Sequence, residues 1–310
     1  EQAQRGVVLT LVSNLATSYV ALRALDRQLE IARATTANFE KTAHIFDLRY
    51  KQGVVSKVEV MQITSQVQQA KAAIPLFEQA IAAQENLISL LLGRNPGPIP
   101  RGKTIDQLLA PVIPADLPST LLERRPDVLQ AEQNLVAANA NVGAARALYY
   151  PNISLTGLLG TVSTTFSDLF TGPSQAWRAG GSIAGPIFTF GAVRGQNASA
   201  DAVREQALLG YQQTILNAFR ETNDALTGSA LKANELAEQQ ARVAALRDFA
   251  RLSNLRFENG MTSYIDVLVA ENELFAAELA SVRISAERQA QVINVYRAMG
   301  GGWVTTATNQ

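Results

Sequence analysis

The chain has 310 residues, of which 47% are hydrophobic, and this content is enough for a folded core. It carries 27 basic and 27 acidic residues, so it has no net positive field to hold a nucleic-acid backbone. Without cysteine and with one histidine, His44, it lacks the residues of thiol catalysis, zinc fingers and multi-histidine metal sites. We therefore expect no cofactor, no metal site and no nucleic-acid partner.

Two long helices are predicted at the start of the chain, over residues 7–51 and 56–92. Both are rich in Ala, Gln, Leu and Glu, and they are separated at Gly53 and interrupted only by Pro75. The pair predicts a helical hairpin. Because the helical spacing begins within the first residues, we expect the sequence to start inside a helix and to be a fragment of a longer protein.

A proline-rich segment follows this hairpin. Seven of the eleven prolines fall within residues 96–126, where fixed φ angles and missing N–H groups prevent a continuous helix. A further helix is predicted over residues 121–148, with Pro126 in its first turns, where a lost donor matters little.

The next stretch avoids charge. Residues 147–193 contain only Asp168 and Arg178 as charged residues, and their prolines and glycines exclude a membrane-spanning helix. Alternation with period two predicts strands over residues 152–159 and 177–190, and hence a hairpin. A soluble sheet and a lipid-facing barrel fit this pattern alike, and Trp177 fits either a membrane interface or a core. Since a lone hairpin is marginal in water, we expect strands from partner chains to close the sheet.

The last part of the chain predicts a second pair of long helices. Residues 193–258 contain no proline, and as one helix they would extend about 100 Å. A return helix is predicted over residues 263–299, and the glycines at 300–302 are typical of a left-handed C-terminal cap.

The two helical hairpins repeat each other at a constant offset in the numbering. The segment RYKQGVVSKVEV at 49–60 aligns with RFENGMTSYIDV at 256–267, with four of twelve positions identical. Gly53 and Gly260 fit chain reversals, and Ser56 and Ser263 fit caps of the returning helices. Glu59 and Asp266, three residues after these serines, fit either capping-box partners or acidic residues favoured in the first turn of a helix. By the same offset, we expect a second copy of the β-hairpin to precede residue 1.

Several segments then carry a family resemblance. They are RRPDVLQAEQNLVAANANVGAAR at 124–146, YPNISLTG at 150–157, GPIF at 185–188, NAFRETNDAL at 217–226 and the RFENG tip at 256–260. In these segments, in the same order around an internal repeat, the chain resembles the outer-membrane factor family, the TolC-like efflux channels, in its NodT-type lipoprotein branch. The resemblance covers essentially the whole chain.

The resemblance implies a mainly α fold with a small β part, assembled as a homotrimer. Long antiparallel helices would form a periplasmic α-barrel and the hairpin would join a transmembrane β-barrel. It implies the following organisation: 1–92, first helical hairpin; 93–122, equatorial segment; 123–150, helix; 151–192, outer-membrane β-hairpin; 193–300, second helical hairpin; 301–310, C-terminal tail.

The implied function is that of the outer-membrane channel of a tripartite efflux system. Such a channel is a passive conduit in the bacterial outer membrane, in contact with its lipid, that exports small molecules such as drugs and is gated at its periplasmic helix tips. The implied partners are a periplasmic adaptor and an inner-membrane pump of the RND type. The sequence identifies neither the substrate nor the particular pump, and it does not show lipidation.

The tips supply the candidate site residues. The resemblance places Asp266 and its repeat mate Glu59 in an acidic ring at the aperture, although both also fit exposed helix-start acids. A second acidic position, one turn beyond Asp266, is Val269 here. Phe257 and Thr262 stand where some relatives carry Tyr and Arg, so no polar latch is carried over. For adaptor contact we name the tip residues, several of them apolar at a solvent-facing turn: Arg49, Gly53, Val54, Val55, Ser56, Arg256, Gly260, Met261 and Ser263.

Two other function classes stay open at this stage. One is a non-channel coiled-coil envelope scaffold with a soluble β insert. The other is an enzyme using carboxylates such as Glu221 and Asp224, which lie three apart on one predicted helix without a pocket signature. We expect no enzymatic activity, because the sequence holds no catalytic constellation, phosphate-binding loop or cofactor motif.

Overall fold

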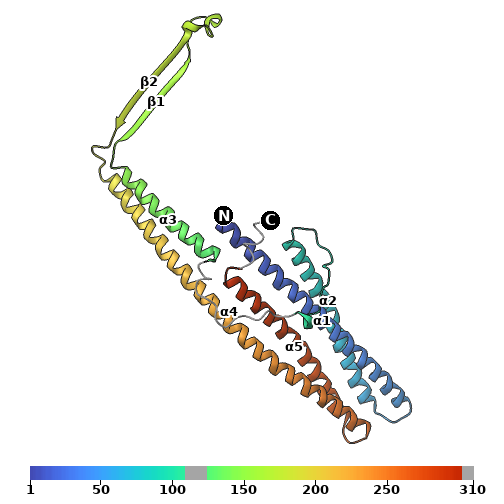
Figure 1. The fold of residues 1–310 in the computed structure, drawn as a ribbon. Coiled ribbons are helices and arrows are strands. Elements are labelled where there is room, and N and C mark those ends of the chain that lie inside the picture. Colours follow the sequence, from blue (N-terminus) through green and yellow to red (C-terminus); the bar gives the residue numbers. More distant parts are fainter. Residues whose placement is uncertain (109–123, 302–310) are drawn as a thin grey trace. The chain divides into compact units, whose positions relative to one another are not determined.

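The computed structural model describes residues 1–108 and 124–301, which are mainly helical with one two-stranded sheet (Figure 1). The helices and strands are, in chain order, α1 Gln2–Lys51, α2 Lys57–Leu91, α3 Pro126–Ala147, β1 Asn152–Thr161, β2 Gln175–Ala184, α4 Ala192–Glu258 and α5 Tyr264–Ala298. The chain forms two compact units, one of Glu1–Asp127 with Asn217–Gln310 and the other of Val128–Leu216.

The first unit contains both helical hairpins. α1 and α2 pack side by side over their length, and α1 also packs along α5 (Figure 1). Side chains connect α4 to α5 as well: the Gln239 amide donates to the Ala277 carbonyl oxygen at 2.9 Å, and Lys232 pairs with Glu287 at 2.7 Å. The antiparallel hairpins predicted from the sequence are therefore present. α2 continues through Pro75, although a proline inside a helix removes one hydrogen-bond donor and its ring crowds the carbonyl group four residues earlier.

The repeat seen in the sequence recurs in the structure. At the end of α2, the Gly93 and Arg94 N–H groups donate to the carbonyl oxygens of Leu90 and Ser89, all at 3.0 Å. At the end of α5, the equivalent groups of Gly300 and Gly301 donate to Arg297 and Tyr296, again at 3.0 Å. Gly93 and Gly300 both have positive φ, +66° and +82°, as a left-handed helix cap requires.

Ion pairs along the hairpins follow the same repeat with reversed charge. Lys71 of α2 reaches Glu40 of α1 at 2.6 Å, and Arg247 of α4 reaches Glu278 of α5 at 2.7 Å. Positions 40 and 71 are the repeat mates of 247 and 278. The repeat has kept a pair at this place while exchanging its signs, so the geometry of the two hairpins is equivalent there.

The described part of the proline-rich segment lies on α1 and α2. Arg101 pairs with Asp26 of α1 at 3.1 Å and with Glu85 of α2, and the bond to Arg101 holds the pKa of the Glu85 carboxyl below its usual value. Tyr19 of α1 accepts a hydrogen bond from the Gly102 N–H at 2.8 Å. Residues 93–108 thus lack long regular structure but are held by side chains from both helices.

The second unit contains α3, the β-hairpin and the first part of α4. β1 and β2 pair antiparallel over ten residues each, from Asn152 opposite Ala184 to Thr161 opposite Gln175. In α4, the Asn197 amide donates to the Ala145 carbonyl oxygen of α3 at 3.0 Å. α4 continues without a break through its three glycines, as the sequence predicts.

Several element boundaries differ by a few residues from the sequence-based expectation, and two of the differences have a clear physical reason. The second strand, expected over residues 177–190, ends at Ala184, because Gly185 and Pro186 follow and proline cannot donate to a strand ladder. The helix expected over residues 121–148 begins at Pro126, the position where proline is favoured at a helix start. The rest of that expectation, residues 121–123, lies outside the described residues, as do Gly302 and most of the 301–310 tail.

By length and composition, α1 is the one helix in the described ranges that is apolar enough to cross a membrane, and a third of its apolar window is buried within the chain. The same composition serves packing between helices, since Val20, Leu22 and Ile31 are buried against neighbouring elements.

Candidate functional site

The tip of the first hairpin is a left-handed glycine followed by a capping box. Gly53 has a φ of +75°, and the N–H groups of Gly53 and Val54 each donate to α1 carbonyl oxygens at 2.9 Å. The Glu59 N–H donates to the Ser56 hydroxyl at 3.4 Å, and the Ser56 N–H donates to the Glu59 carboxylate at 2.7 Å. Glu59 is half-buried, so its carboxylate is engaged in stabilising the start of α2.

The tip of the second hairpin repeats the turn but uses its acid differently. Gly260 has a φ of +69°, and the Ser263 hydroxyl accepts a hydrogen bond from the Ile265 N–H at 3.3 Å. The Asp266 carboxylate instead accepts a hydrogen bond from the Thr262 hydroxyl. Asp266 is exposed and lies in the first turn of α5, where a negative charge is favourable.

Apolar side chains project into solvent at both tips. Val54 is 68% exposed and Met261 is 70% exposed, whereas Val55 is half-buried and packs inward. Beside the first tip, an open groove of about 420 Å³ runs along one face of α2 and is lined by Lys57, Val58, Met61, Gln62 and Ser65. Exposed apolar residues gathered in this way are typical of a surface that binds another protein.

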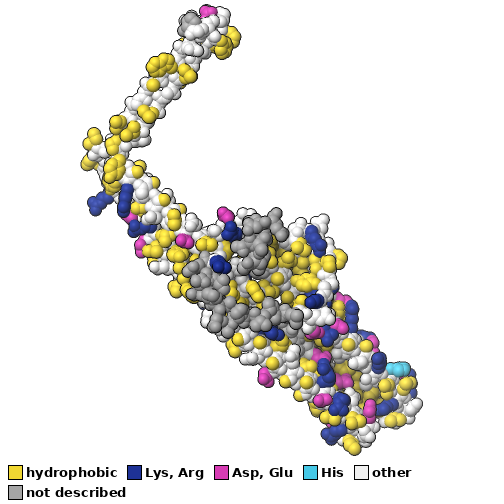
Figure 2. All heavy atoms as spheres, in the orientation of Figure 1, with side chains coloured by type: hydrophobic (Ala, Val, Ile, Leu, Met, Phe, Trp, Pro, Cys, Tyr) yellow, Lys and Arg dark blue, Asp and Glu magenta, His cyan; other side chains and the backbone are white. Residues whose placement is uncertain are grey.

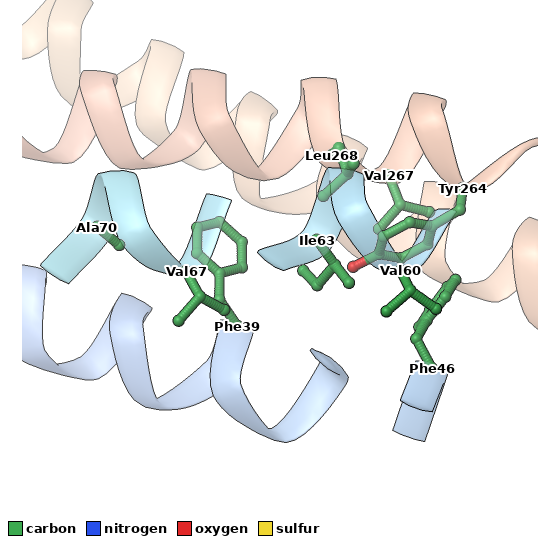
Figure 3. Close-up of a cluster of buried hydrophobic side chains, with 9 residues drawn as sticks. All are labelled: Phe39, Phe46, Val60, Ile63, Val67, Ala70, Tyr264, Val267 and Leu268. Atoms are coloured by element: carbon green, nitrogen blue, oxygen red, sulfur yellow. The ribbon is translucent and has the colours of Figure 1, made fainter. Parts of the chain in front are cut away.

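A buried cluster, which we term the tip core, joins the two hairpins just behind their turns (Figure 3). α1, α2 and α5 supply its side chains, which are Phe39, Phe46, Val60, Ile63, Val67, Ala70, Tyr264, Val267 and Leu268. Phe257 of α4 packs against it from the side. Because all four helices contribute, the two tips form one packed body.

Three aromatic rings form the centre of the tip core. The Phe46 ring lies 4.2 Å from the Tyr264 ring and 5.9 Å from the Phe257 ring, measured between centroids, and the last two rings are 5.1 Å apart. The Arg49 guanidinium lies 5.8 Å from the centre of the Phe257 ring. Of the residues predicted for adaptor contact, Arg49 is therefore half-buried and turned toward the second hairpin, whereas Arg256 is exposed.

The contact between Phe257 and Tyr264 has a counterpart at the same repeat positions of the first hairpin. Phe257 and Tyr264 stand at the positions of Tyr50 and Lys57 in the first hairpin, where the Lys57 ammonium lies 5.2 Å from the Tyr50 ring centre. Both tips thus hold a ring contact between residues seven apart that face each other across the turn. In the first tip the contact is cationic and exposed, and in the second it is aromatic and largely buried.

The β-hairpin has one mainly apolar face, which ends in the polar pair Thr161 and Gln175, and one face of mostly polar or small residues that also includes Leu158. The apolar face carries Ile153, Leu155, Gly157 and Leu159 of β1 and Trp177, Ala179, Gly181 and Ile183 of β2. The other face carries Asn152, Ser154, Thr156, Leu158 and Gly160 of β1 and Ala176, Arg178, Gly180, Ser182 and Ala184 of β2. On this second face the hydroxyls of Ser154 and Ser182 meet across the strands at 2.7 Å.

The apolar face has no cover from the rest of its unit. Leu155 is 87% exposed and Leu159 is 86% exposed, and the side of the hairpin drawn in Figure 2 shows uncharged atoms along the strands. At about 3.4 Å per residue and a tilt near 40°, ten-residue strands span about 24 Å along the membrane normal, close to the height of the apolar band of an outer-membrane barrel. Trp177 lies on this face near the loop end of the strand, where aromatic residues flank such bands.

The carboxylates considered for catalysis are engaged in ion pairs. Glu221 pairs with Arg125 at 2.7 Å, and Asp224 pairs with Arg220 at 3.6 Å on the exposed surface of α4. Within residues 1–108 and 124–301, no three His, Asp or Glu side chains lie together as metal ligands would, and His44 is exposed on α1.

One half-buried carboxylate was not predicted from the sequence. Glu271 of α5 faces a cavity of about 330 Å³ between α1, α4 and α5, and it accepts a hydrogen bond from the Asn254 amide at 3.2 Å. Burial raises the pKa of the Glu271 carboxyl above its usual value. The sequence does not single out Glu271, because the cavity that it faces is lined largely by residues of α1, at the other end of the chain.

The sequence reasoning also missed the aromatic residues of the tip core as candidates. Their sequence signal is the pair Phe257 and Tyr264, which flank the RFENG turn and are spaced seven apart. Helical periodicity places Phe46 on the apolar face of α1, but it does not identify a partner on a helix as distant in the sequence as α5.

Comparison with known proteins gives one family. The model of the outer membrane efflux protein family matches residues 1–94 and 117–301. The cation efflux system protein CusC of Escherichia coli O6:H1 is 35% identical over 305 residues, and the alignment covers 98% of this chain and 66% of that protein. The toluene efflux pump outer membrane protein TtgI of Pseudomonas putida is 33% identical, with 98% and 65% covered. The chain thus spans just under two thirds of the length of these relatives.

Solved structures give the same fold. A crystal structure of CusC superposes with a TM-score of 0.89 at 34% identity, covering 97% of this chain and 71% of that one. The open-state MtrE outer membrane channel of Neisseria gonorrhoeae superposes with a TM-score of 0.87 at 26% identity, covering 97% and 68%.

With its long paired helices and its two-faced β-hairpin, the chain has the fold of outer-membrane channel components. Within that class, the chain belongs to the outer membrane efflux protein family. The predicted family and the predicted fold class, mainly α with a small β part and internally duplicated, are confirmed.

Proposed function

We propose that this chain forms the outer-membrane channel of a tripartite efflux system, as a homotrimeric and passive conduit for small molecules such as drugs. The observation that carries the proposal is the β-hairpin, whose uncharged apolar face is exposed in the single chain. In water such a face is unfavourable, whereas in lipid it is the surface that a barrel strand requires. The edge strands must then be paired with strands of other hairpins, because unsatisfied backbone groups are too costly in a bilayer.

The helices would form the wall of a periplasmic α-barrel. In this proposal residues 1–92 and 193–300 are the helical hairpins, 93–122 an equatorial segment, 123–150 a helix, 151–192 the membrane hairpin and 301–310 a tail. Exposed apolar residues on α2, such as Leu76 and Leu90, support packing against neighbouring protomers.

The proposed partners are a periplasmic adaptor, bound at the tips, and an inner-membrane pump of the RND type, which supplies the energy. The contact residues would be Arg49, Gly53, Val54, Val55, Ser56, Arg256, Gly260, Met261 and Ser263. The exposure of Val54 and Met261 supports this surface. Val55 and Arg49 would act indirectly, because they pack against the tip core and position the turn.

A photocrosslinker placed at Val54 or at Met261 tests the adaptor surface in cells. We expect both positions to capture the adaptor encoded with the channel. The matched control is Val203, an exposed apolar residue of α4 in the other compact unit, which should capture no adaptor. Capture of the adaptor from Val203 but from neither tip would contradict the assignment.

The aperture ring is proposed to depend on Asp266 more than on Glu59. Asp266 is exposed and its carboxylate is held by a single neighbouring hydroxyl, whereas Glu59 is half-buried in a capping box. Because Val269 occupies the position one helical turn beyond Asp266, the second hairpin of each protomer would contribute one acidic residue to the ring. Asp266→Asn should reduce cation preference in single-channel recordings, and the surface variant Asp248→Asn in α4 should not. Unchanged conductance and selectivity in Asp266→Asn would remove Asp266 from the aperture.

Conductance decides between a channel and a helical scaffold with a soluble β insert. The protein expressed from its complete reading frame should form trimers that conduct ions across planar bilayers, and its deletion should raise drug accumulation in cells. Leu155→Asp, on the apolar face, should abolish membrane insertion, whereas Thr156→Asp, on the other face, should preserve it. A protein that stays water-soluble and conducts nothing would support the scaffold.

A further inference from the structure

One charged residue stands on the strands of the β-hairpin. β1 and β2 together contain Arg178 and no other Asp, Glu, Lys or Arg. By the pairing register, Arg178 lies on the polar face, opposite Leu158 and between Gly180 and Ala176. An arginine on the lipid face would cost about 2–4 kcal/mol near the bilayer midplane, so its position on the other face is the one that a barrel permits.

The surroundings of Arg178 leave its charge uncompensated within the unit. Among the described residues, no carboxylate lies within ion-pair distance of its guanidinium, and the side chain is exposed. The nearest acid along the hairpin, Asp168, lies in the loop and accepts a hydrogen bond from the Thr165 hydroxyl at 2.7 Å. The electric field of a charge without a nearby counter-charge acts on the ions that pass it.

The neighbouring positions on this face are small. A Cβ atom built on Gly180 or Gly160 would meet no atom within 4 Å, so the space beside Arg178 is open. Arg178 has the longest side chain on the polar face. This side chain can extend away from the strands without obstruction. Arg178 lies three residues after Gln175, the first residue of β2, at the loop end of the hairpin.

We propose that Arg178 forms a ring of positive charge inside the assembled β-barrel, one residue per protomer, and that this ring favours anions over cations at the exit of the channel. The inference rests on the proposed trimeric channel and adds a selectivity element to it. The ring would act in series with the acidic aperture proposed for the helix tips, and it would have the opposite sign. Three like charges facing a water-filled lumen raise the local concentration of anions through the field that they share.

Reversal potentials in a KCl gradient test this assignment. The protein expressed from its complete reading frame is reconstituted in planar bilayers as wild type, R178K, R178Q and R178E. We expect R178Q to lower the anion-to-cation permeability ratio about threefold and R178E about tenfold, because a ring of single charges produces a potential on the order of the thermal energy. The matched control R178K keeps the charge and should keep the wild-type ratio.

Salt concentration provides a second readout. The Debye length falls from about 10 Å at 0.1 M to about 3 Å at 1 M, so the difference between wild type and R178E should shrink strongly at high salt if it arises from charge in the lumen. A difference that persists at 1 M would indicate a change of pore shape and would overturn the proposal.

The remaining outcomes are also decisive. A wild-type protein that does not conduct would refute the proposed channel itself. A conducting wild type whose permeability ratio is unchanged in R178Q and R178E would refute the Arg178 ring alone. If R178Q failed to assemble into trimers while R178K did assemble, Arg178 would be a packing residue and the ring would be excluded.

Discussion

The ring of Phe46, near the end of α1, lies 4.2 Å from the ring of Tyr264, at the start of α5, and this contact links two hairpins that are far apart in the sequence. Both residues are almost fully buried. These rings, with Phe257 of α4 and the apolar residues around them, form the part of the helical unit in which all four long helices meet.

Phe46→Ala should destabilise the helical unit by about 3–5 kcal/mol, because it removes a buried aromatic ring and leaves a cavity between the two tips. Thermal unfolding followed by circular dichroism measures the loss. The matched control is Ile45→Ala, a truncation at the preceding residue, whose side chain is exposed. An equal effect of the two substitutions would mean that the tip core contributes no specific stability.

The turn glycines should resist substitution. Gly53→Ala and Gly260→Ala each place a side chain at positive φ, +75° and +69°, which costs about 1–2 kcal/mol for an L-residue. No atom lies within 4 Å of an added Cβ at either glycine, so the cost would come from the backbone alone. Gly210→Ala, in the interior of α4 and equally open, should instead stabilise the helix by about 0.5–1 kcal/mol. Opposite signs in urea unfolding would confirm the assignment.

Glu271 predicts a pH-dependent stability. Because burial raises the pKa of its carboxyl in the folded protein, the folded state binds the proton more tightly than the unfolded state. The stability contributed by this group therefore falls as pH rises through the interval from the unfolded pKa, about 4.5, to the raised folded value. At pH 7 the Glu271→Gln variant should be more stable than wild type, and the difference should vanish below pH 4.

The melting temperature of Glu271→Gln at pH 4 and at pH 7 measures this effect. Gln at 271 keeps an oxygen that can accept the Asn254 amide hydrogen bond, so the hydrogen bond is not lost with the charge. The control is Glu273→Gln, an exposed carboxylate two residues further on the same helix. A constant difference between the two pH values would contradict the assigned pKa direction.

The sequence predicts the elements better than it predicts their contacts. Repeats, turn glycines and period-two alternation are local signals, and they place α4, the turns at Gly53 and Gly260, and the first strand correctly. The end of β2 was missed because apolar residues continue past Ala184, although Pro186 prevents further pairing. The Phe46 contacts, by contrast, depend on packing between helices at opposite ends of the chain, which no local pattern encodes.

The candidate site shows the same division. Glu59 and Asp266 occupy the same repeat position, and from the sequence both fit either the aperture ring or the start of a helix. In the structure Glu59 bonds back to Ser56, whereas Asp266 bonds to Thr262, whose repeat mate is Val55. The two tips differ both in the acid itself and at the position one turn before it, and only the side-chain geometry reveals the different bonds.

Arg125 predicts a further effect on stability. Its guanidinium is buried, donating to the carboxylates of Asp127 and Glu221 at 2.7 Å each and to the Ala298 carbonyl oxygen at 3.0 Å. It thereby ties the start of α3 to α4 and to the last turn of α5. Because the two carboxylates are themselves partly exposed, water replaces some of the lost bonds, and we expect Arg125→Ala to cost about 2–3 kcal/mol.

The adjacent arginine provides the control for this prediction. Arg124 is exposed, and its replacement by Ala should change stability by less than about 0.5 kcal/mol. Arg125→Lys keeps the charge but not the planar fork that reaches three acceptors at once, so it should restore only part of the loss. In chemical unfolding we expect the free energy of unfolding to decrease in the order Arg124→Ala, Arg125→Lys, Arg125→Ala. Full restoration by Lys would show that charge alone, and not the geometry of the guanidinium, holds the three helices together.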